Sequence, residues 1–347
     1  MKDIQNTEYT SLFNEIKQII DESRKHIAVS VNTAITATYW HIGNKIKNTI
    51  LKGKRAEYGK QVILNLSKQL TAEYGKGWSK QQLQHCLRFA ETFPDFEIVS
   101  ALWRELSWSH FKILMYQDTE LKRKFYTQMC RMENWSTRTL QNKIDSMLFE
   151  RTAISKKPEE LAKLELQKLA TENRLSIDLV FKDHYVLDFL NLKNAFSEND
   201  LETAILNRLE QFILELGVGF TFVSRQKRMT IDNTDFYLDL LFYHRKLKRL
   251  VAVELKIGKF KASYKGQMEL YLRWLEKYEK EKDEELPIGL ILCAEGNHEQ
   301  IELLQLEKSN IKVAEYISKH LPKKLLAEKL HKFTETAKKI LENKIER

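Results

Sequence analysis

The hydrophobic pattern of the chain changes once along its length. Before residue 175, apolar residues recur at spacings of three and four, and no run alternates with a period of two. Such spacing predicts helices and no strands. We expect helices at 8–50, 58–75, 109–131 and 136–150, and a further one that begins after the capping residue Ser79 and ends before Pro94. The first half therefore predicts an all-helical domain.

The second half has a different pattern. A predicted helix at 201–216, capped by Asp200, precedes three runs rich in β-branched and aromatic residues, which predict strands at 220–223, 236–243 and 250–257. The elements expected after them are a helix at 264–278, a strand at 287–293, a helix near 298–308, a strand at 311–316 and a C-terminal helix from about Pro322. The order αβββαβ predicts a mixed α/β domain with a meander at its centre.

A polar, charged stretch with one proline separates the two patterns, at residues 152–175. It predicts a linker that is helical in part. We therefore expect a helical domain over residues 1–151 and a mixed domain over residues 176–347. The fold class is α + α/β, with the αβββαβ order in the second domain.

The charge of the chain bears on its partners. The 57 Lys and Arg residues exceed the 48 Asp and Glu residues, which gives a net charge of +9. Nearly all of this excess lies in the first 174 residues, whereas the rest of the chain is almost neutral. Such asymmetry indicates a polyanionic partner, usually nucleic acid. The alternative is a mildly basic protein with no nucleic-acid role.

Composition also bears on the compartment. Cys86, Cys130 and Cys293 lie far apart, which argues against a disulfide framework and against a zinc site built on paired cysteines. No run of 18 apolar residues exists, so we expect no transmembrane helix and no membrane partner. The first residues lack the apolar core of a secretion signal. We therefore expect a cytoplasmic protein.

The strongest chemical signal lies in two neighbouring strands. Glu254 and Lys256 are two residues apart in an apolar strand and therefore share a face. Asp239 lies in the preceding strand, and the short basic link between the two predicts an antiparallel hairpin. A turn centred on Lys246-Leu247 puts Asp239 directly opposite Glu254, with Cβ atoms roughly 5 Å apart.

Two opposed carboxylates in an apolar hairpin repel each other, and an unpaired buried charge is expensive. The pair makes sense around a divalent cation. Mg²⁺, with Mn²⁺ as a substitute, suits so few protein oxygens because it keeps waters and takes further oxygens from a phosphate. Lys256 beside the ion would stabilise charge on the phosphate or lower the pKa of the attacking water. The alternative is a local ion pair between Glu254 and Lys256 on a solvated face.

These residues resemble the active site of the PD-(D/E)xK, or restriction-endonuclease-like, nucleases, although Leu238 stands where the name has proline. On the next predicted helix, Gln267 and Tyr271 form a Gln-x-x-x-Tyr pair. This pair resembles the extra motif of the branch that contains the RecB nuclease domain and phage exonucleases. The resemblance implies that Gln267 helps to hold the site and the DNA.

Longer stretches sharpen the resemblance. Residues 236–256 and 265–274, together with 39–43 and 214–220, are similar to the YhcG-type bacterial nuclease family. Members of that family join a helical N-terminal domain to a nuclease domain. The resemblance implies a metal-dependent nuclease that acts on DNA, with a link to restriction and to defence against foreign DNA.

Nucleases of this fold often carry another acid on the first helix, and Glu202 and Glu210 are the candidates. On a helical wheel Glu202 lies within the apolar stripe, whereas Glu210 lies at its edge, so we favour Glu202. The alternative role for Glu202 is that of a helix N-terminal acid favoured by the macrodipole. Asp235 shares a face with Asp239 and is either a reserve ligand or a turn residue.

Two segments are candidates for nucleic-acid contact. Arg225 and Gln226, past the first predicted strand, either touch phosphate or form a solvated strand end. Residues 74–83 join two predicted helices by a short turn with glycines, which could be a helix-turn-helix element. The residues that would face a groove are Lys80, Gln81, Gln84 and Arg88. Ordinary helical packing or dimerisation is the alternative.

The sequence thus predicts a Mg²⁺-dependent nuclease that hydrolyses the phosphodiester bonds of DNA. By analogy with enzymes that cut two strands, a homodimer is an option. Two alternatives stay open. One is a non-catalytic nucleic-acid-binding protein on a nuclease-like scaffold, and the other is an RNA nuclease.

Overall fold

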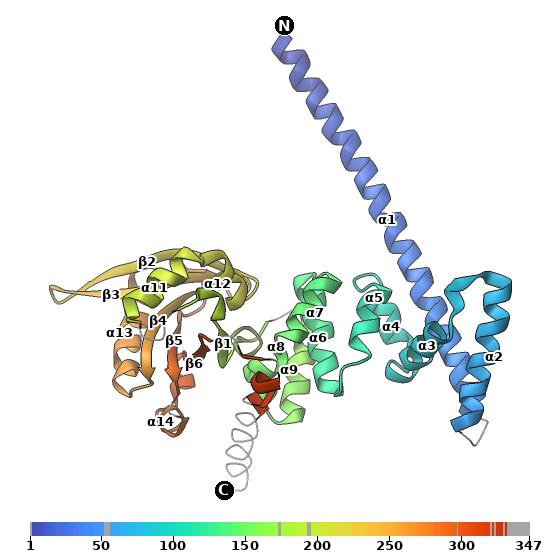
Figure 1. Cartoon of the computed structure of the whole chain (residues 1–347). Coiled ribbons are helices and arrows are strands. Elements are labelled where there is room, and N and C mark those ends of the chain that lie inside the picture. The colour runs from blue at the N-terminus through green and yellow to red at the C-terminus, as the bar shows by residue number, and fades with distance from the viewer. Residues whose placement is uncertain are drawn as a thin grey trace. The chain divides into compact units, whose positions relative to one another are not determined.

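The computed structural model describes residues 2–51, 56–172, 175–192, 196–296, 298–319, 321–322, 324–328 and 330–331. The chain forms two compact units, Met1–Gln141 and Asn142–Arg347, which follow one another from blue to red in Figure 1. The predicted domain limits at 151 and 176 stay a prediction.

The first unit is helical throughout its described residues. Its helices are α1 (Lys2–Leu51), α2 (Ala56–Tyr74), α3 (Lys80–Thr92), α4 (Phe96–Leu102), α5 (Trp108–Leu114), α6 (Glu120–Glu133) and the start of α7 (Thr137–Asp145). The Ser79 cap is confirmed, because its hydroxyl accepts the backbone N–H of Gln82 at 3.2 Å. The single helix expected at 109–131 is wrong, since the chain leaves the helix at Met115 and begins another after Thr119, which caps α6.

Helices α1 and α3 approach each other unusually closely. A Cβ added at Gly43 of α1 would lie only 1.8 Å from the backbone oxygen of Cys86 in α3, so glycine is required at this crossing. Nearby, the indole N–H of Trp40 donates to the backbone oxygen of Phe93 at 2.7 Å. The buried face of α3 packs into the same region through Leu83, Cys86, Phe89 and Ala90.

The second unit begins with helical segments and continues into a sheet. Its helices are the end of α7, α8 (Leu148–Arg151), α9 (Glu159–Glu172), α10 (Ile177–Val180), α11 (Glu198–Asn207), α12 (Leu209–Leu216), α13 (Ser263–Tyr278) and α14 (His298–Leu303). Its strands are β1 (His184–Val186), β2 (Phe220–Ile231), β3 (Thr234–His244), β4 (Arg249–Lys259), β5 (Ile288–Glu295) and β6 (Ile311–Ile317). The αβββαβ order expected from the sequence is confirmed.

The six strands form one mixed sheet in the order β1-β6-β5-β4-β3-β2. β2, β3 and β4 are an antiparallel meander, whereas β4, β5, β6 and β1 run parallel. β4 is therefore the strand at which the sheet changes from antiparallel to parallel. The β3–β4 register pairs Leu240 with Val253 and His244 with Arg249, which confirms the register predicted from a turn at Lys246-Leu247.

The sheet is covered on both faces. Leu241 of β3 and Ala252 of β4 lie in a buried core with Met268 and Tyr271 of α13. Because successive strand residues point to opposite faces, Phe242 faces the other side, where its ring lies 6.0 Å from that of Phe212 in α12. Figure 1 shows α11 and α12 over the meander, with α13 apart from them.

Several element boundaries differ from those expected. The helix at 201–216 is two helices that meet at Arg208, and the cap of α11 is Ser197 rather than Asp200. The helix near 298–308 is α14 followed by a 3₁₀ turn at Leu306–Ser309. The three-residue strand β1 has no sequence signal of its own. Of the expected C-terminal helix, residues 324–328 and 330–331 are helical, and the remainder lies outside the described residues.

Within the part of the chain that the structure describes, no helix combines the length and the apolar character needed to cross a membrane.

The α1–α3 crossing gives a stability prediction. Gly43→Ala gains up to about 1 kcal/mol of helix propensity, but its Cβ would collide with the backbone at Cys86 and force the helices apart. We expect a net loss and a lower Tm of the helical unit. Tryptophan fluorescence measures it, because every tryptophan except Trp274 precedes residue 142. Gly77→Ala, where an added Cβ meets nothing within 4 Å, should leave the Tm unchanged. A Gly43→Ala protein as stable as the wild type would contradict this.

Candidate active site

The site is built on one cross-strand step of the meander. The regular pairing of β3 with β4 ends at Leu240 and Val253, so Asp239 and Glu254 occupy the next step. There the backbone N–H of Leu255 donates to Oδ2 of Asp239 at 2.8 Å instead of to a strand carbonyl. The strands thus separate where the two carboxylates meet, and Asp239 is held by the backbone of the opposite strand.

Glu254 is buried, with only 3% of its surface exposed. Its Oε2 lies 3.0 Å from Nζ of Lys256, whereas its Oε1 is buried and has no hydrogen-bond partner among the described residues. Burial, and next the charge of Asp239, raise the pKa of Glu254 to about 7. Burial also raises the pKa of Asp239, although the N–H of Leu255 and the ammonium of Lys256 oppose it. This unpartnered oxygen is the unusual feature of the site.

Lys256 provides the positive charge of the site. Burial disfavours its ammonium form, but Glu254, Glu198 and Asp239 outweigh burial and raise its pKa. Besides its contact with Glu254, its Nζ lies 3.6 Å from Oε2 of Glu198 and 5.4 Å from the ring centre of Tyr264. The lysine is therefore charged and fixed in position by acids on two elements.

Gln226 of β2 completes the step on the other side of Asp239. The neighbouring pairs Arg225–Leu240 and Lys227–Leu238 place it opposite Asp239. Its φ of 45° is in the left-handed region, a conformation that costs a non-glycine residue on the order of 1 kcal/mol and concentrates at functional sites. Its Nε2 donates to Oε2 of Glu202 at 2.7 Å and to Oδ1 of Asp239 at 3.3 Å.

The candidates on the first helix separate clearly. Glu202 of α11 is buried at 8% exposure, and burial raises its pKa; through Gln226 it is joined to Asp239. Glu210 lies on α12 and is exposed. Asp235 accepts from Thr230 at 2.8 Å and pairs with Arg228 in the β2–β3 hairpin, which fits a hairpin residue rather than a reserve ligand.

The Gln-x-x-x-Tyr pair lies beside the carboxylates, and its hydrogen bonds lead to the backbone of β3 and not to a carboxylate. Nε2 of Gln267 donates to the hydroxyl of Tyr271 at 2.7 Å, and that hydroxyl donates to the backbone oxygen of Tyr237 at 3.4 Å. Tyr237 precedes Asp239 by two residues. The pair therefore anchors α13 to β3 beside the site, and burial raises the pKa of Tyr271.

Sequence reasoning missed Glu198. It lies in the first turn of α11, and its carboxylate contacts Lys256. The available signal was the spacing Ser197-x-x-Asp200, a capping box in which Ser197 is the cap and Asp200 the third helical residue. With Asp200 taken as the cap, Glu198 lay outside the expected helix and was not considered as a site residue.

The residues proposed for the helical unit lie on α3, joined to α2 by a 3₁₀ turn at Lys76–Trp78. Lys80, Gln81 and Gln84 are exposed. The guanidinium of Arg88 lies 4.2 Å above the ring of Tyr116 and its Nε donates to the backbone oxygen of Met115. Three of the four side chains are thus available to a partner, and Arg88 is already engaged.

The described residues hold no group of three or more His, Cys, Asp and Glu side chains arranged to bind a metal ion. The two carboxylates of Asp239 and Glu254 nonetheless fit a hard cation. Mg²⁺ is commonly held by one or two protein carboxylates, with waters and substrate phosphate as its other ligands. The buried Oε1 of Glu254, left without a donor, is an oxygen for such an ion.

Comparison with known proteins decides the family. A family model described as the YhcG PDDEXK nuclease domain matches residues 178–331, and the DUF1016 N-terminal domain matches residues 15–151. A curated relative from Escherichia coli (strain K12), named "Putative nuclease YhcG", is 36% identical over 318 residues that cover 83% of this chain and 84% of the relative. The chain belongs to the YhcG family of PDDEXK nucleases. The resemblance expected from the sequence is confirmed.

Solved structures are similar over a smaller part. A repair endonuclease from Pyrococcus abyssi is 22% identical with a TM-score of 0.26, and the match covers 38% of this chain and 50% of that one. An EndoMS–dsDNA2 complex is 18% identical with a TM-score of 0.27, over 38% of this chain and 49% of that one. The chain spans about half the length of these solved chains.

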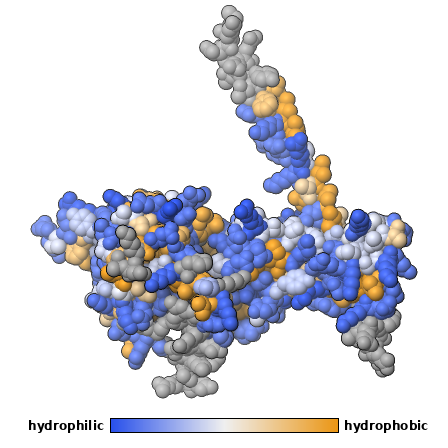
Figure 2. Space-filling view, viewed as in Figure 1, coloured by the Kyte–Doolittle hydropathy of each residue, from blue (hydrophilic) through white to orange (hydrophobic). Residues whose placement is uncertain are grey.

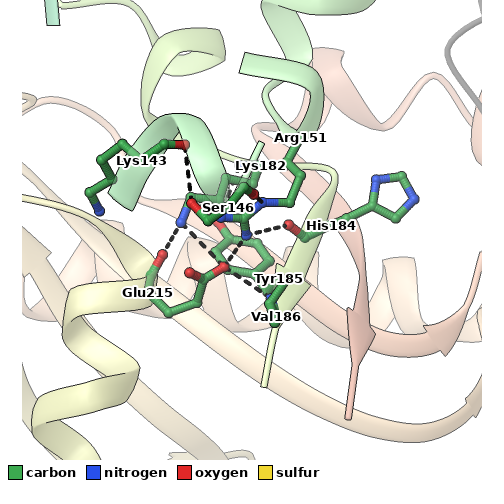
Figure 3. Close-up of polar contacts among 8 residues, drawn as sticks. All are labelled: Lys143, Ser146, Arg151, Lys182, His184, Tyr185, Val186 and Glu215. Carbon is green, nitrogen blue, oxygen red and sulfur yellow. Dashed lines mark hydrogen bonds and ion pairs between the residues drawn. The ribbon is translucent and has the colours of Figure 1, made fainter. Parts of the chain in front are cut away.

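The family-like segment 214–220 has a structural role away from the site. Figure 3 shows Glu215 of α12 at the centre of a buried polar cluster with Arg151 and Lys182. Its Oε1 also accepts the backbone N–H of Val186 in β1 at 2.9 Å. Burial lowers the pKa of Lys182 to about 7. The cluster thus ties α8 and β1 to α12.

The pKa of Glu254 gives a testable pH dependence. Because folding raises this pKa from 4.5 to about 7, the folded state binds more protons than the unfolded state in that window, and stability falls as the pH rises through it. Glu254→Gln removes the titration. With a chelator present, we expect the variant to be more stable than the wild type at pH 8, by about 1–3 kcal/mol, and the difference to shrink toward pH 5.

Denaturant unfolding at several pH values measures this effect. The matched control is Glu295→Gln on neighbouring β5, where the carboxylate is exposed and pairs with Lys259. Surface changes of this kind alter stability by about 0.5 kcal/mol or less. Equal stability of Glu254→Gln and the wild type at pH 8 would show that Glu254 carries no burial cost.

Proposed function

We propose that the chain hydrolyses the phosphodiester bonds of DNA with a divalent cation, Mg²⁺ or Mn²⁺, held by Asp239 and Glu254. The observation that carries the proposal is the single step of the meander where two carboxylates and an ammonium group meet. A buried carboxylate oxygen without a donor is costly, and among the residues that the structure describes Oε1 of Glu254 has no donor and lies next to a second carboxylate. Membership of the PDDEXK nuclease family supports the same reading.

The protein groups divide the work by their position. When bound, the cation supplies an activated water and neutralises charge on the phosphate. Lys256, held 3.0 Å from Glu254, presents its ammonium group to the phosphate oxygens beside the carboxylates. Because its pKa is raised, it acts as a fixed positive charge rather than as a base. Electrostatic stabilisation of this kind is the main resource of phosphoryl transfer.

Gln226 and Glu202 position the site. The amide of Gln226 bridges Glu202 and Asp239 and so fixes the rotamer of Asp239 from one side, while the N–H of Leu255 fixes it from the other. We therefore assign Gln226 a positioning role in place of the phosphate contact expected from the sequence. Gln267, through Tyr271, holds the adjoining part of β3.

The substrate is a nucleic acid in this proposal because the chain is basic and because exposed side chains suited to phosphate lie in both units. DNA rather than RNA is what the family resemblance implies. In the mixed unit the exposed Arg225 borders the site, and in the helical unit Lys80, Gln81 and Gln84 face solvent. The cytoplasmic location, expected from the composition of the chain, and the role in restriction or defence against foreign DNA, implied by the family resemblance, both stay predictions.

Removing the central charges should abolish catalysis. We expect Asp239→Ala and Lys256→Ala to lose Mg²⁺-dependent cleavage by at least about 10³-fold, since each removes a group that acts on the reacting phosphate, while DNA binding is largely kept. Linear, circular and branched DNA and RNA, each with and without Mg²⁺ or Mn²⁺, form the substrate panel. The control is Glu295→Gln, which changes an exposed carboxylate of the adjoining strand β5 that has no proposed part in catalysis. It should cleave like the wild type.

Each result of this panel has a meaning. Undiminished cleavage by the two alanine variants ends the assignment. Metal binding that is lost in the Asp239/Glu254 double variant supports the enzyme. A wild-type protein that binds DNA but neither binds metal nor cleaves the DNA is the non-catalytic scaffold. Cleavage of RNA alone would replace DNA as the substrate.

Gln226 gives a separate test. Gln226→Leu removes both carboxylate contacts and leaves Asp239 held on one side only, by the N–H of Leu255, so we expect kcat to fall about 10–100-fold, the usual effect of losing a residue that orients a metal ligand. KM for DNA should stay near the wild-type value. The matched change Arg225→Leu, one residue away, should instead raise KM. A Gln226→Leu enzyme with only KM altered would restore the phosphate-contact role.

A further inference from the structure

Among the described residues, the first part of α1 is exposed to solvent. Every side chain from residue 12 to residue 28 is exposed. Asn32 ties the next part of α1 to its unit, because its amide donates to the backbone oxygen of Trp103 at 2.9 Å and accepts the N–H of Trp108 at 3.1 Å. Figure 1 shows this stretch of α1 clear of the other helices of its unit.

The uncovered stretch is apolar along one side. We call this the α1 stripe, and between 40% and 65% of the surface of each of its residues is exposed. The stripe consists of Leu12, Phe13, Ile16, Ile19, Ile20, Ile27, Val31 and Ile35. Figure 2 shows hydrophobic residues along the projecting helix next to a hydrophilic side. An isolated helix in water gains nothing from a continuous row of large apolar side chains, and exposed apolar patches of this kind mark interaction sites. The stripe therefore indicates a partner.

We propose that the α1 stripe pairs with the same stripe of a second copy of this chain, in a parallel two-helix coiled coil. Phe13, Ile20 and Ile27 are spaced by seven residues, and Ile16 follows Phe13 by three, which are the a and d positions of a heptad repeat. A partner helix of the same sequence offers the same repeat in register, so a second copy is the occupant that the spacing selects.

The area of the stripe agrees with this partner. Eight apolar side chains, each 40–65% exposed, together with the stems of the flanking basic residues, supply area toward the roughly 800 Å² per partner of a standard stable interface. Ser23 and Ser30 fall on the two d positions that follow Ile16, where a small polar side chain weakens the packing between the helices. The pairing is therefore that of a moderate, concentration-dependent dimer.

The flanking charges select the orientation. Lys17 and Arg24 occupy e positions, and Leu12 and Ile19 occupy g positions. In an antiparallel pair the e positions face each other, which opposes like charges. In a parallel pair each e position faces a g position, so the stems of Lys17 and Arg24 pack over Leu12 and Ile19 with their charges in solvent.

Parallel pairing brings the two helical units to the same end of the coiled coil. The dimer then carries two copies of the site at Asp239 and Glu254, one for each strand of a duplex. This last consequence rests on the proposed function, whereas the pairing itself does not.

The test is the molecular mass in solution, without metal or nucleic acid. We expect analytical ultracentrifugation of the full chain to show a dimer that dissociates on dilution, and Ile16→Glu with Ile20→Glu to be a monomer at every concentration. The control is Gln18→Glu with Lys25→Glu on the polar side, which should keep the dimer. An unchanged Tm of the helical unit shows that the Ile variant is folded. A monomeric wild type, or a dimeric Ile variant, overturns the proposal.

Orientation is tested by a disulfide. Ile27→Cys places identical a positions side by side only in the parallel pair, so mild oxidation should give a covalent dimer. Lys25→Cys, at an outward f position, should not give one. The native Cys86, Cys130 and Cys293 are buried and do not interfere. A dimer that forms without this crosslink overturns the parallel arrangement. All of these readouts are independent of cleavage, so they stand apart from a failure of the proposed function.

Discussion

The repulsion between Asp239 and Glu254 is the constraint around which the mixed unit is arranged. The two carboxylates meet on adjacent strands in a buried setting, where like charges cost most. The protein offsets part of the cost with Lys256 and with the N–H of Leu255. Among the described residues, Oε1 of Glu254 is left without a donor. The pair of Asp239 and Glu254 therefore costs stability, and its presence points to a function rather than to a structural role.

The surrounding elements all hold that step in place. Gln226 adopts a strained φ to reach Asp239, and Tyr271 reaches across from α13 to the backbone of β3. On the other side of β4, the parallel strand β5 is buried from Ile288 to Cys293. Because such a core is closely packed, β4 cannot move without disrupting it. Strain and repulsion at the site are thus offset by packing elsewhere, which is the usual trade between stability and activity.

The sequence was enough for the meander and its central residues. Runs rich in β-branched and aromatic residues locate the strands, and a short link between two of them sets their register, so the opposition of Asp239 and Glu254 follows from counting along the chain. The breaks at Met115 and Arg208 could not be found in this way, because apolar spacing continues through them and only backbone conformation marks the end of each helix. Glu198 was missed for another reason, because the cap of α11 was placed at Asp200 instead of Ser197.

The sequence by itself determined the family, the order of elements and the pair of carboxylates, since these depend on local periodicity and on short-range pairing. Only the tertiary structure decided which polar groups are paired: Gln226 donates to Glu202 and Asp239, and Gln267 donates to Tyr271. It also decided that Oε1 of Glu254 has no partner among the described residues and that the α1 stripe is exposed. Such facts depend on which segments far apart in the chain become neighbours, and a linear pattern carries no record of that.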